Sequence, residues 1–300
     1  MNRIHIPSAL LALALALAAG PVPARAQLVF DRAIYQDDKE GALKFPEGVA
    51  CNDAGALVVA DSGNARLLLF TYKDGLLSGG TPVKPTQLAY PIRVQLDSKG
   101  NIWVLDRKTR KIVKLDAKGG YLGTVELKGG SAITSSMPVS FKLDAQDHAY
   151  VLDGVAGRVV VLDAAGAVTR QIEIPKGKAT FTDIHVDPGG AIYAVDGVGA
   201  TLWVAEKGAP AFKPLTQSME DRMNFPVYMT GRGGKLYVVD QFGNGIVTLG
   251  VDGSYQGRQL AIGWNEGLLY YPAQICVNGK GEVAIADRSN NRVQLFTAGK

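Results

Sequence analysis

The densest group of reactive side-chain types in the sequence lies near its C-terminus. Residues 282–296, EVAIADRSNNRVQLF, place Asp287, Asn290, Asn291 and Arg292 between two apolar runs. A carboxylate, two amides and a guanidinium within six residues could hold a metal ion or take part in catalysis. Whether they do depends on whether the group is unique in the chain.

The group is not unique, because the chain repeats its pattern six times. The stretches FPEGVACNDAGALVVADSGNARLLLF (45–70) and YPAQICVNGKGEVAIADRSNNRVQLF (271–296) match without a gap. Four weaker copies lie between them, and the six copies begin near residues 45, 90, 137, 180, 225 and 271. A period of 43–47 residues is typical of a repeat architecture.

Each copy is predicted to form short β-strands. Val, Ile, Leu and Tyr recur at period two and are punctuated by Gly, Asp and Asn, which is typical of antiparallel hairpins. The sequence therefore predicts an all-β, six-bladed β-propeller with four antiparallel strands per blade. The sixth copy ends before a fourth strand, so residues 27–36 are predicted to complete blade six and close the ring.

The copies resemble NHL repeats. That pattern runs P-x-G-I-A-V-D, then G-x-I-Y-V-A-D, then an Asn and an Arg before an apolar strand, and residues 45–70 and 271–296 carry it well. The resemblance covers essentially all of residues 27–300 and implies a six-bladed propeller. Proteins of this family mostly bind proteins, peptides or nucleic acid, so the resemblance indicates the fold more strongly than the function.

Because its pattern recurs in every copy, the C-terminal group is better interpreted as a structural feature than as a reactive site. An Asp follows the second strand of every copy, at Asp61, Asp106, Asp153, Asp196, Asp240 and Asp287. Six equivalent positions around a ring cannot all be one active site. We interpret these residues as structural, accepting backbone N–H bonds in a turn where the following Asn tolerates a left-handed conformation.

The N-terminus has the composition of a secretory signal peptide. An Arg-containing start, a twelve-residue apolar run and small residues at Ala24 and Ala26 predict cleavage after Ala26. The apolar run is shorter than a membrane span requires. We therefore expect a secreted or periplasmic protein with no membrane span, made of residues 27–300 as a single propeller domain.

The charge of the expected mature chain is nearly balanced. Removing Arg3 and Arg25 from the 32 basic residues leaves 30 against 28 acidic ones, without a basic block. This surface does not predict a nucleic-acid partner. Cys51 and Cys276 are the two cysteines. They lie in opposite strand registers of neighbouring blades, so a disulfide between them is geometrically allowed, and a pair of buried thiols is the alternative.

Departures from the repeat indicate where a ligand could bind. Side chains alternate between the two faces of a strand, and the first strand of each copy alternates polar with apolar residues. The polar register is predicted to line the central channel with Arg93, Gln95, Ser140, Lys142, Asp183, His185, Tyr228, Thr230 and Gln274. Convergent polar groups at a channel mouth suit a small polar or anionic ligand. The alternative is a water-filled channel whose polar lining binds no ligand.

Catalysis has weaker support in the sequence. A zinc site with three His ligands is excluded by count, because residues 27–300 contain only His148 and His185. A lactonase-like metal site would have to use Asp183 with Tyr228, Gln274 and Ser140, plus Glu47. That is a poor set of ligands for a hard metal ion, because Arg93 would compete with the cation. The types Ser140, His185 and Asp183 suit a nucleophilic triad, but two of them share one strand. We therefore predict no metal and no cofactor.

The preferred hypothesis is an exported, non-catalytic propeller that binds a protein, a peptide or a small polar ligand. The site would be the channel mouth and the inter-blade loops at 71–89, 216–224 and 261–270, with Trp264 and Tyr228 as aromatic anchors. One alternative is a metal-assisted hydrolase or lyase of the lactonase kind. A second is a structural scaffold in an extracytoplasmic assembly.

Overall fold

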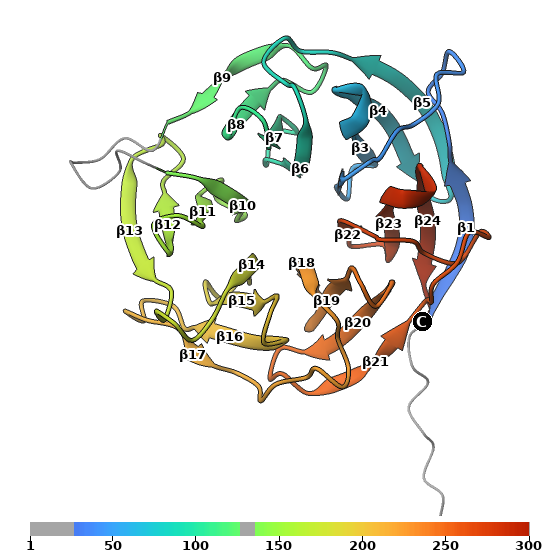
Figure 1. Ribbon diagram of the computed structural model, residues 1–300. Coiled ribbons are helices and arrows are strands. Elements are labelled where there is room, and N and C mark those ends of the chain that lie inside the picture. Colours follow the sequence, from blue (N-terminus) through green and yellow to red (C-terminus); the bar gives the residue numbers. More distant parts are fainter. Residues whose placement is uncertain (1–26, 127–135, 300) are drawn as a thin grey trace, which may run out of the picture.

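A computed structural model describes residues 27–126 and 136–299 of the chain. These residues form six four-stranded antiparallel sheets, which are arranged as blades around a common axis (Figure 1). The predicted all-β, six-bladed propeller is confirmed. The predicted signal peptide, residues 1–26, lies outside the described residues.

Each blade is built from strands a to d, counted outward from the axis. The a strands are β2 (Gly48–Cys51), β6 (Pro91–Leu96), β10 (Pro138–Leu143), β14 (Phe181–Val186), β18 (Pro226–Arg232) and β22 (Ile275–Val277). The b strands are β3 (Ala56–Asp61), β7 (Ile102–Asp106), β11 (Ala149–Asp153), β15 (Ile192–Asp196), β19 (Lys235–Asp240) and β23 (Glu282–Asp287).

The outer half of each blade consists of the c and d strands. The c strands are β4 (Arg66–Lys73), β8 (Lys111–Leu115), β12 (Arg158–Leu162), β16 (Thr201–Ala205), β20 (Gly245–Gly250) and β24 (Arg292–Ala298). The d strands are β5 (Leu76–Val83), β9 (Tyr121–Val125), β13 (Val168–Glu173), β17 (Lys213–Pro214), β21 (Tyr255–Gln259) and β1 (Leu28–Ile34). Two 3-10 turns, η1 (Ser62–Asn64) and η2 (Arg288–Asn290), connect strands b and c of blades one and six.

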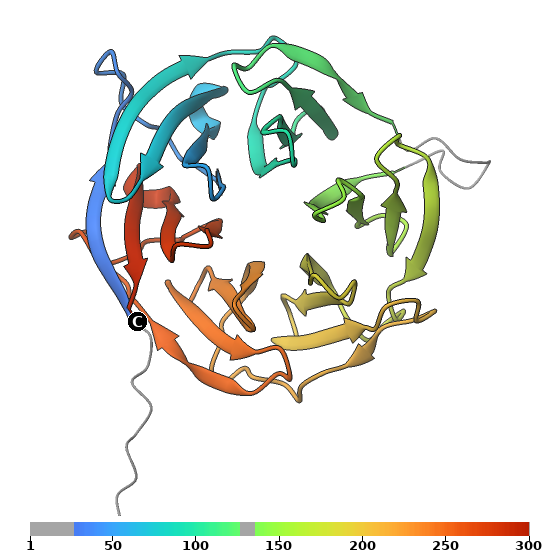
Figure 2. The ribbon, with the colours of Figure 1, turned by 180° about the vertical axis from the view of Figure 1, so that it is seen from behind.

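The two ends of the described chain close the ring. Strand β1 pairs antiparallel with β24, with Leu28 opposite Ala298 and Ile34 opposite Val293. Both views of the ribbon show these segments from opposite ends of the chain side by side (Figures 1 and 2). The predicted closure by the N-terminal strand is confirmed, and it leaves no unpaired outer edge on β24.

A disulfide also joins the first blade to the last. Cys51 and Cys276 are bonded, with their Cα atoms 6.0 Å apart. Both belong to the hydrophobic cluster between blades one and six. The bond spans 225 residues of chain, so it fixes the same junction that β1 and β24 fix by hydrogen bonds.

The expectation of an inter-blade loop at 71–89 is wrong for most of its length. Strand β4 continues to Lys73, and residues 76–83 return as β5. Asp74 and Gly75 both have positive φ, 53° and 75°, which is the conformation of a tight two-residue hairpin turn. The Asp74–Gly75 pair therefore indicates a β-hairpin within residues 71–89.

Six hydrophobic clusters fill the junctions between neighbouring blades. The apolar register of the a strands packs into the cluster shared with the preceding blade. Its central members are fully buried: Val49, Val94, Phe141, Ile184, Met229 and Ile275. The other register points to the opposite side, because successive side chains in a strand alternate between its faces. Ala50, Tyr228 and Cys276 of that register pack toward the following blade.

The antiparallel order gives the disc two different faces. The b–c turns and the connections from strand d to the next strand a lie on one face, which we call the upper face. The a–b and c–d hairpins lie on the lower face. No helix in the described part of the chain is long and apolar enough to cross a membrane.

Candidate functional site

The six repeated aspartates hold the upper ends of the blades together. Each carboxylate is buried and lies at the end of strand b. Each accepts a backbone N–H from the segment entering strand a of its own blade, at 2.6–3.1 Å: from Lys44, Tyr90, Met137, Thr180, Asn224 and Tyr270. These contacts agree with a structural role in every blade.

The C-terminal group is the most elaborate version of this arrangement. Asp287 accepts bonds from Asn290 Nδ2 at 2.8 Å and Arg292 Nε at 2.7 Å. Burial raises the pKa of Asp287, although these donors oppose the rise. The remaining nitrogens of Arg292 donate to the carbonyls of Trp264 and Leu268, both at 2.9 Å. The group therefore shapes the connection that precedes blade six.

The structure brings the nine predicted channel residues to the axis and buries most of them. Gln95, His185 and Thr230 are partly exposed. The other six are at most 9% exposed: Arg93, Ser140, Lys142, Asp183, Tyr228 and Gln274. We call these six residues the axial plug. Whether any of the nine contacts a ligand stays a prediction.

Asp183 is the centre of one half of the axial plug. Its carboxylate lies 2.9 Å from Lys142 Nζ and accepts a hydrogen bond from the Ser140 hydroxyl. It also accepts the backbone N–H of Met229 at 2.7 Å, while Lys142 Nζ donates to the Met229 carbonyl at 2.9 Å. Strands of blades three, four and five are thus joined through one buried carboxylate.

Arg93 and Gln274 form the other half of the axial plug. Arg93 Nη2 donates to the Val227 carbonyl at 3.0 Å, and its guanidinium lies over the Tyr228 ring. Gln274 Nε2 donates to the Val49 and Val94 carbonyls at 2.8 and 2.9 Å. The a strands are sheet edges, and the axial plug supplies partners for backbone groups that those edges leave unpaired.

The residues of the suggested triad are not arranged as one. The Ser140 hydroxyl donates directly to Asp183, and no hydrogen bond joins Ser140 to His185 among the described residues. Burial, and then the positive charge of Lys142, lower the pKa of His185 to about 3. His185 is therefore neutral near pH 7 and lies against the Tyr193 ring.

A second charged group lies at the upper end of the axis, and we call it the mouth cluster: Glu47, Tyr90, Arg107 and Arg288. Glu47 is 3% exposed. Its carboxylate lies 2.6 Å from Arg107 Nη2 and 3.0 Å from Arg288 Nε, and it accepts the Tyr90 hydroxyl at 3.0 Å. Two guanidinium groups against one carboxylate leave one positive charge in excess.

Both arginines of the mouth cluster pack against aromatic rings. The guanidinium of Arg107 lies 5.2 Å from the centre of the Tyr90 ring, and that of Arg288 lies 5.4 Å from the Phe45 ring. Burial, and then the charge of Glu47, raise the pKa of Tyr90, so its hydroxyl remains a donor. The side chain of Arg107 is 55% exposed, and its charge can be reached from solvent.

Reasoning from the first strand alone missed the two arginines. Arg107 and Arg288 occupy the first position of their b–c turns, where the other copies have Ser62, Gly154, Gly197 and Gln241. Glu47 is also the only charged residue directly after the repeated Pro or Phe. Comparing these two repeat positions would have exposed the cluster.

The carboxylates near the axis are already bound to cations. Glu47 contacts two arginines and Asp183 contacts Lys142. Within residues 27–126 and 136–299, no group of three or more His, Cys, Asp or Glu is placed to hold a metal ion. The donor set near the axis therefore fits an anion better than a divalent cation.

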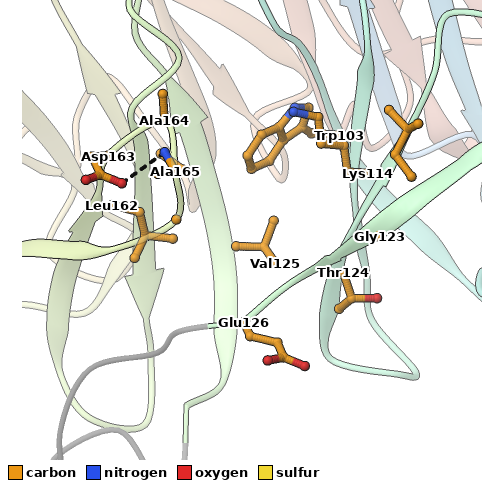
Figure 3. Close-up of a pocket in the computed structure, with 13 residues that line it drawn as sticks. Trp103, Lys114, Gly123, Thr124, Val125, Glu126, Leu162, Asp163, Ala164 and Ala165 are labelled. Carbon is orange, nitrogen blue, oxygen red and sulfur yellow. Dashed lines mark hydrogen bonds between the residues drawn. The ribbon is translucent and has the colours of Figure 1, made fainter.

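A cleft of about 410 Å³ lies between blades two and three, away from the axis (Figure 3). Trp103, Val125 and Leu162 provide its apolar lining, and none of the predicted site residues takes part. Trp103 Nε1 donates to Asp97, and Lys114 lies over the Trp103 ring. The cleft ends at Glu126, the last residue described before 136, so we assign it no function.

Comparison with known proteins agrees with the fold. The NHL repeat family matches residues 269–296, which contain the C-terminal group. No curated protein sequence matches the chain. The expected NHL resemblance is confirmed: the chain carries an NHL repeat and folds as a six-bladed propeller.

Solved structures share the fold at low sequence identity. A streptogramin B lyase is 15% identical with a TM-score of 0.63, covering 90% of this chain and 97% of the lyase. A gluconolactonase from Xanthomonas campestris is 14% identical with a TM-score of 0.63, covering 90% and 88%. A chain of the nidogen/laminin complex is 16% identical with a TM-score of 0.59, covering 78% and 91%. At these identities the likeness shows the fold alone.

Proposed function

We propose that the protein is an exported, non-catalytic binding propeller that recognises an anionic group of its ligand at the mouth cluster. The observation that carries this proposal is the excess of guanidinium over carboxylate at the upper end of the axis. The ligand would be a protein, a peptide or a small polar molecule that presents a carboxylate or a similar anion.

The buried position of Glu47 supports this assignment. Because Glu47 is 3% exposed and its carboxylate is bonded to both arginines, it holds the two guanidinium groups in place and is itself shielded from a ligand arriving from solvent. An anion that approaches Arg107 meets a guanidinium already oriented by Glu47 and the Tyr90 ring. Preorganised donors lose less side-chain entropy on binding, and charge-assisted bonds are the strong ones.

Two alternatives remain distinct from this proposal. A metal-assisted hydrolase or lyase would need carboxylates that are bound here by Arg and Lys. A lyase and a gluconolactonase are among the proteins that share the fold. A scaffold would use the rim of the disc and not the mouth cluster. Export is supported by the signal-like N-terminus and by the Cys51–Cys276 disulfide, which favours an oxidising compartment.

Calorimetric titration of the mature chain with acetate, succinate and N-acetyl-aspartate tests the proposal. We expect saturable binding that weakens at least about tenfold in Arg107→Gln, because one charge-assisted contact is lost. Lys108→Gln is the matched control, since it removes the same charge from the next residue of the same turn.

Equal affinities for the wild type and Arg107→Gln would contradict the proposal, as would equal losses in both variants. Metal-dependent hydrolysis of a lactone by the mature chain would replace it with the enzymatic alternative.

A further inference from the structure

Five aromatic side chains form a continuous row on the upper face of blades five and six. We call them the aromatic ridge: Phe225, Phe242, Tyr271, Tyr270 and Trp264. Ring centres of successive members lie 4.9, 5.8, 4.9 and 5.9 Å apart. They come from the connections that enter these two blades and from the b–c turn of blade five.

Two members of the aromatic ridge face solvent. Trp264 is 74% exposed and Phe242 is 48% exposed. The other two tryptophans of the chain, Trp103 and Trp203, are only 8% and 6% exposed. Contiguous exposed aromatic surface of this kind marks interaction sites in soluble proteins.

The exposure of Trp264 does not come from a loose loop. Arg292 donates to the carbonyls of Trp264 and Leu268, and Gln294 Oε1 accepts the backbone N–H of Gly267 at 2.8 Å. Asn290 Nδ2 donates to the carbonyl of Gly263 at 2.9 Å. Two buried side chains, Arg292 and Gln294, and the partly buried Asn290 therefore hold the backbone of a connection that presents an indole to solvent.

The aromatic ridge adjoins a cationic area. The backbone N–H of Ser289 donates to the Tyr270 carbonyl at 3.0 Å, which places the ridge beside Arg288 of the mouth cluster. The six b–c turns contain no Asp or Glu after the buried turn aspartates. They contain Arg107 and Arg288 of the mouth cluster, and two further basic residues in the turn of blade two. The acidic side chains of this face, such as Glu266, lie in the connections between blades. A ligand that spans both areas needs acidic and large apolar groups together.

We infer that the aromatic ridge and the mouth cluster together bind an extended peptide segment that carries a carboxylate next to large apolar side chains. The carboxylate lies at Arg107 and Arg288, and the apolar side chains pack against Phe242 and Trp264. This inference rests on the proposed function, because it uses the same anion site and adds the chemistry of the partner.

The ring orientations favour a peptide over stacked sugars or bases. Phe225 and Phe242 are stacked at 18°, and the other neighbouring rings of the aromatic ridge are tilted: 74° between Phe242 and Tyr271, 72° between Tyr271 and Tyr270, and 54° between Tyr270 and Trp264. Stacking of successive bases requires exposed ring faces along the bound strand. Tilted rings instead form an uneven apolar surface, which suits side chains of different shapes.

Selection of random octapeptides on the immobilised mature chain tests this inference. We expect the enriched peptides to combine Asp or Glu with Trp, Phe, Leu or Ile. Their affinity for Trp264→Ala should fall at least about tenfold, as for an interface anchor. Leu76→Ala is the matched control, because Leu76 is 75% exposed on the opposite face. Trp264→Ala should bind succinate as the wild type does.

The possible results separate the inference from the proposed function. Peptides that lack acidic residues, or that bind Trp264→Ala and wild type equally, overturn the inference and leave the anion site intact. Absence of enrichment above the Trp264→Ala background also overturns it. Failure of Arg107→Gln to weaken succinate binding overturns the proposed function itself.

Discussion

Two groups of charged side chains lie along the propeller axis, and they differ in what their cations contact. In the axial plug, Arg93 and Lys142 are 9% and 4% exposed and bind strand carbonyls or Asp183. In the mouth cluster, Arg107 binds Glu47 but keeps 55% of its side chain exposed. The cations of the axial plug are therefore bound to groups of the protein itself, whereas Arg107 of the mouth cluster can still contact a ligand.

The difference follows from where each group lies relative to the strand edges. The axial plug is level with the a strands, whose inner edges have backbone groups to satisfy. The arginines of the mouth cluster come from b–c turns, and Glu47 and Tyr90 come from the segments that enter strand a, so all four lie outside the strands. Polar residues facing a propeller axis are therefore not equivalent: their height along the axis decides whether they support the ring or face a ligand.

Removing the central carboxylate of the axial plug should have the largest effect. Asp183→Ala leaves the ammonium of Lys142 buried without its counter-charge, and we expect a loss of about 4 kcal/mol in the free energy of unfolding. Urea unfolding monitored by tryptophan fluorescence measures it. The double variant Asp183→Ala/Lys142→Met should recover part of the loss. A decrease in the free energy of unfolding of less than about 1 kcal/mol would contradict the structural role assigned to the axial plug.

Opening the disulfide should weaken the ring on which both groups depend. Because the bond closes 225 residues, we expect Cys51→Ala/Cys276→Ala to be about 3 kcal/mol less stable than the oxidised wild type. Guanidinium unfolding with and without a reductant measures this difference. The wild type should respond to the reductant and the double variant should not. The strand pair β1–β24 should still close the ring in both.

The same substitution in the two groups compares them directly. Arg93→Gln removes bonds to buried carbonyls and should cost about 2 kcal/mol of stability. Arg107→Gln changes a largely exposed side chain and should cost less than about 1 kcal/mol, since Arg288 and Tyr90 still contact Glu47. Thermal melts measure both. Equal losses of stability in the two variants would contradict the assignment of a structural role to the axial plug and a binding role to the mouth cluster.

The smallest expected effect is the acid sensitivity of His185 at the lower end of the axis. Its pKa, lowered to about 3, lies below the ordinary value of 6.5. The unfolded chain therefore binds the proton first, and the stability that neutral His185 contributes is lost as the pH falls from 6.5 toward 3. Since His185 as a residue is only partly buried, we expect it to contribute about 1 kcal/mol of the loss between pH 7 and pH 5.

The His185→Gln variant isolates this contribution. Its stability should fall less than that of the wild type over the same pH range, as measured by urea unfolding at each pH. Parallel pH profiles would show that Lys142 and the surrounding strands do not disfavour a charged imidazole.

Most of the fold could be predicted from the sequence because its signals are local. Alternating apolar residues, Asp and Gly turns and a constant period specify a blade, and the short sixth copy predicts the closing strand. The error at 71–89 came from treating a variable stretch as a loop, although its Asp74–Gly75 pair marks a tight turn. The repeated Asp residues were interpretable for the same reason, since their partners lie in the same blade.

The sequence by itself determined the blade, its sixfold repetition and the register that faces the axis, because these depend on spacings of a few residues. Only the tertiary structure decided which of those side chains bind one another. Arg288 and Glu47 are 241 residues apart, and Arg93 and Val227 are 134 apart. Such pairs meet only because closing the ring brings different blades to one axis. A local sequence pattern cannot predict a contact between residues so far apart in the chain.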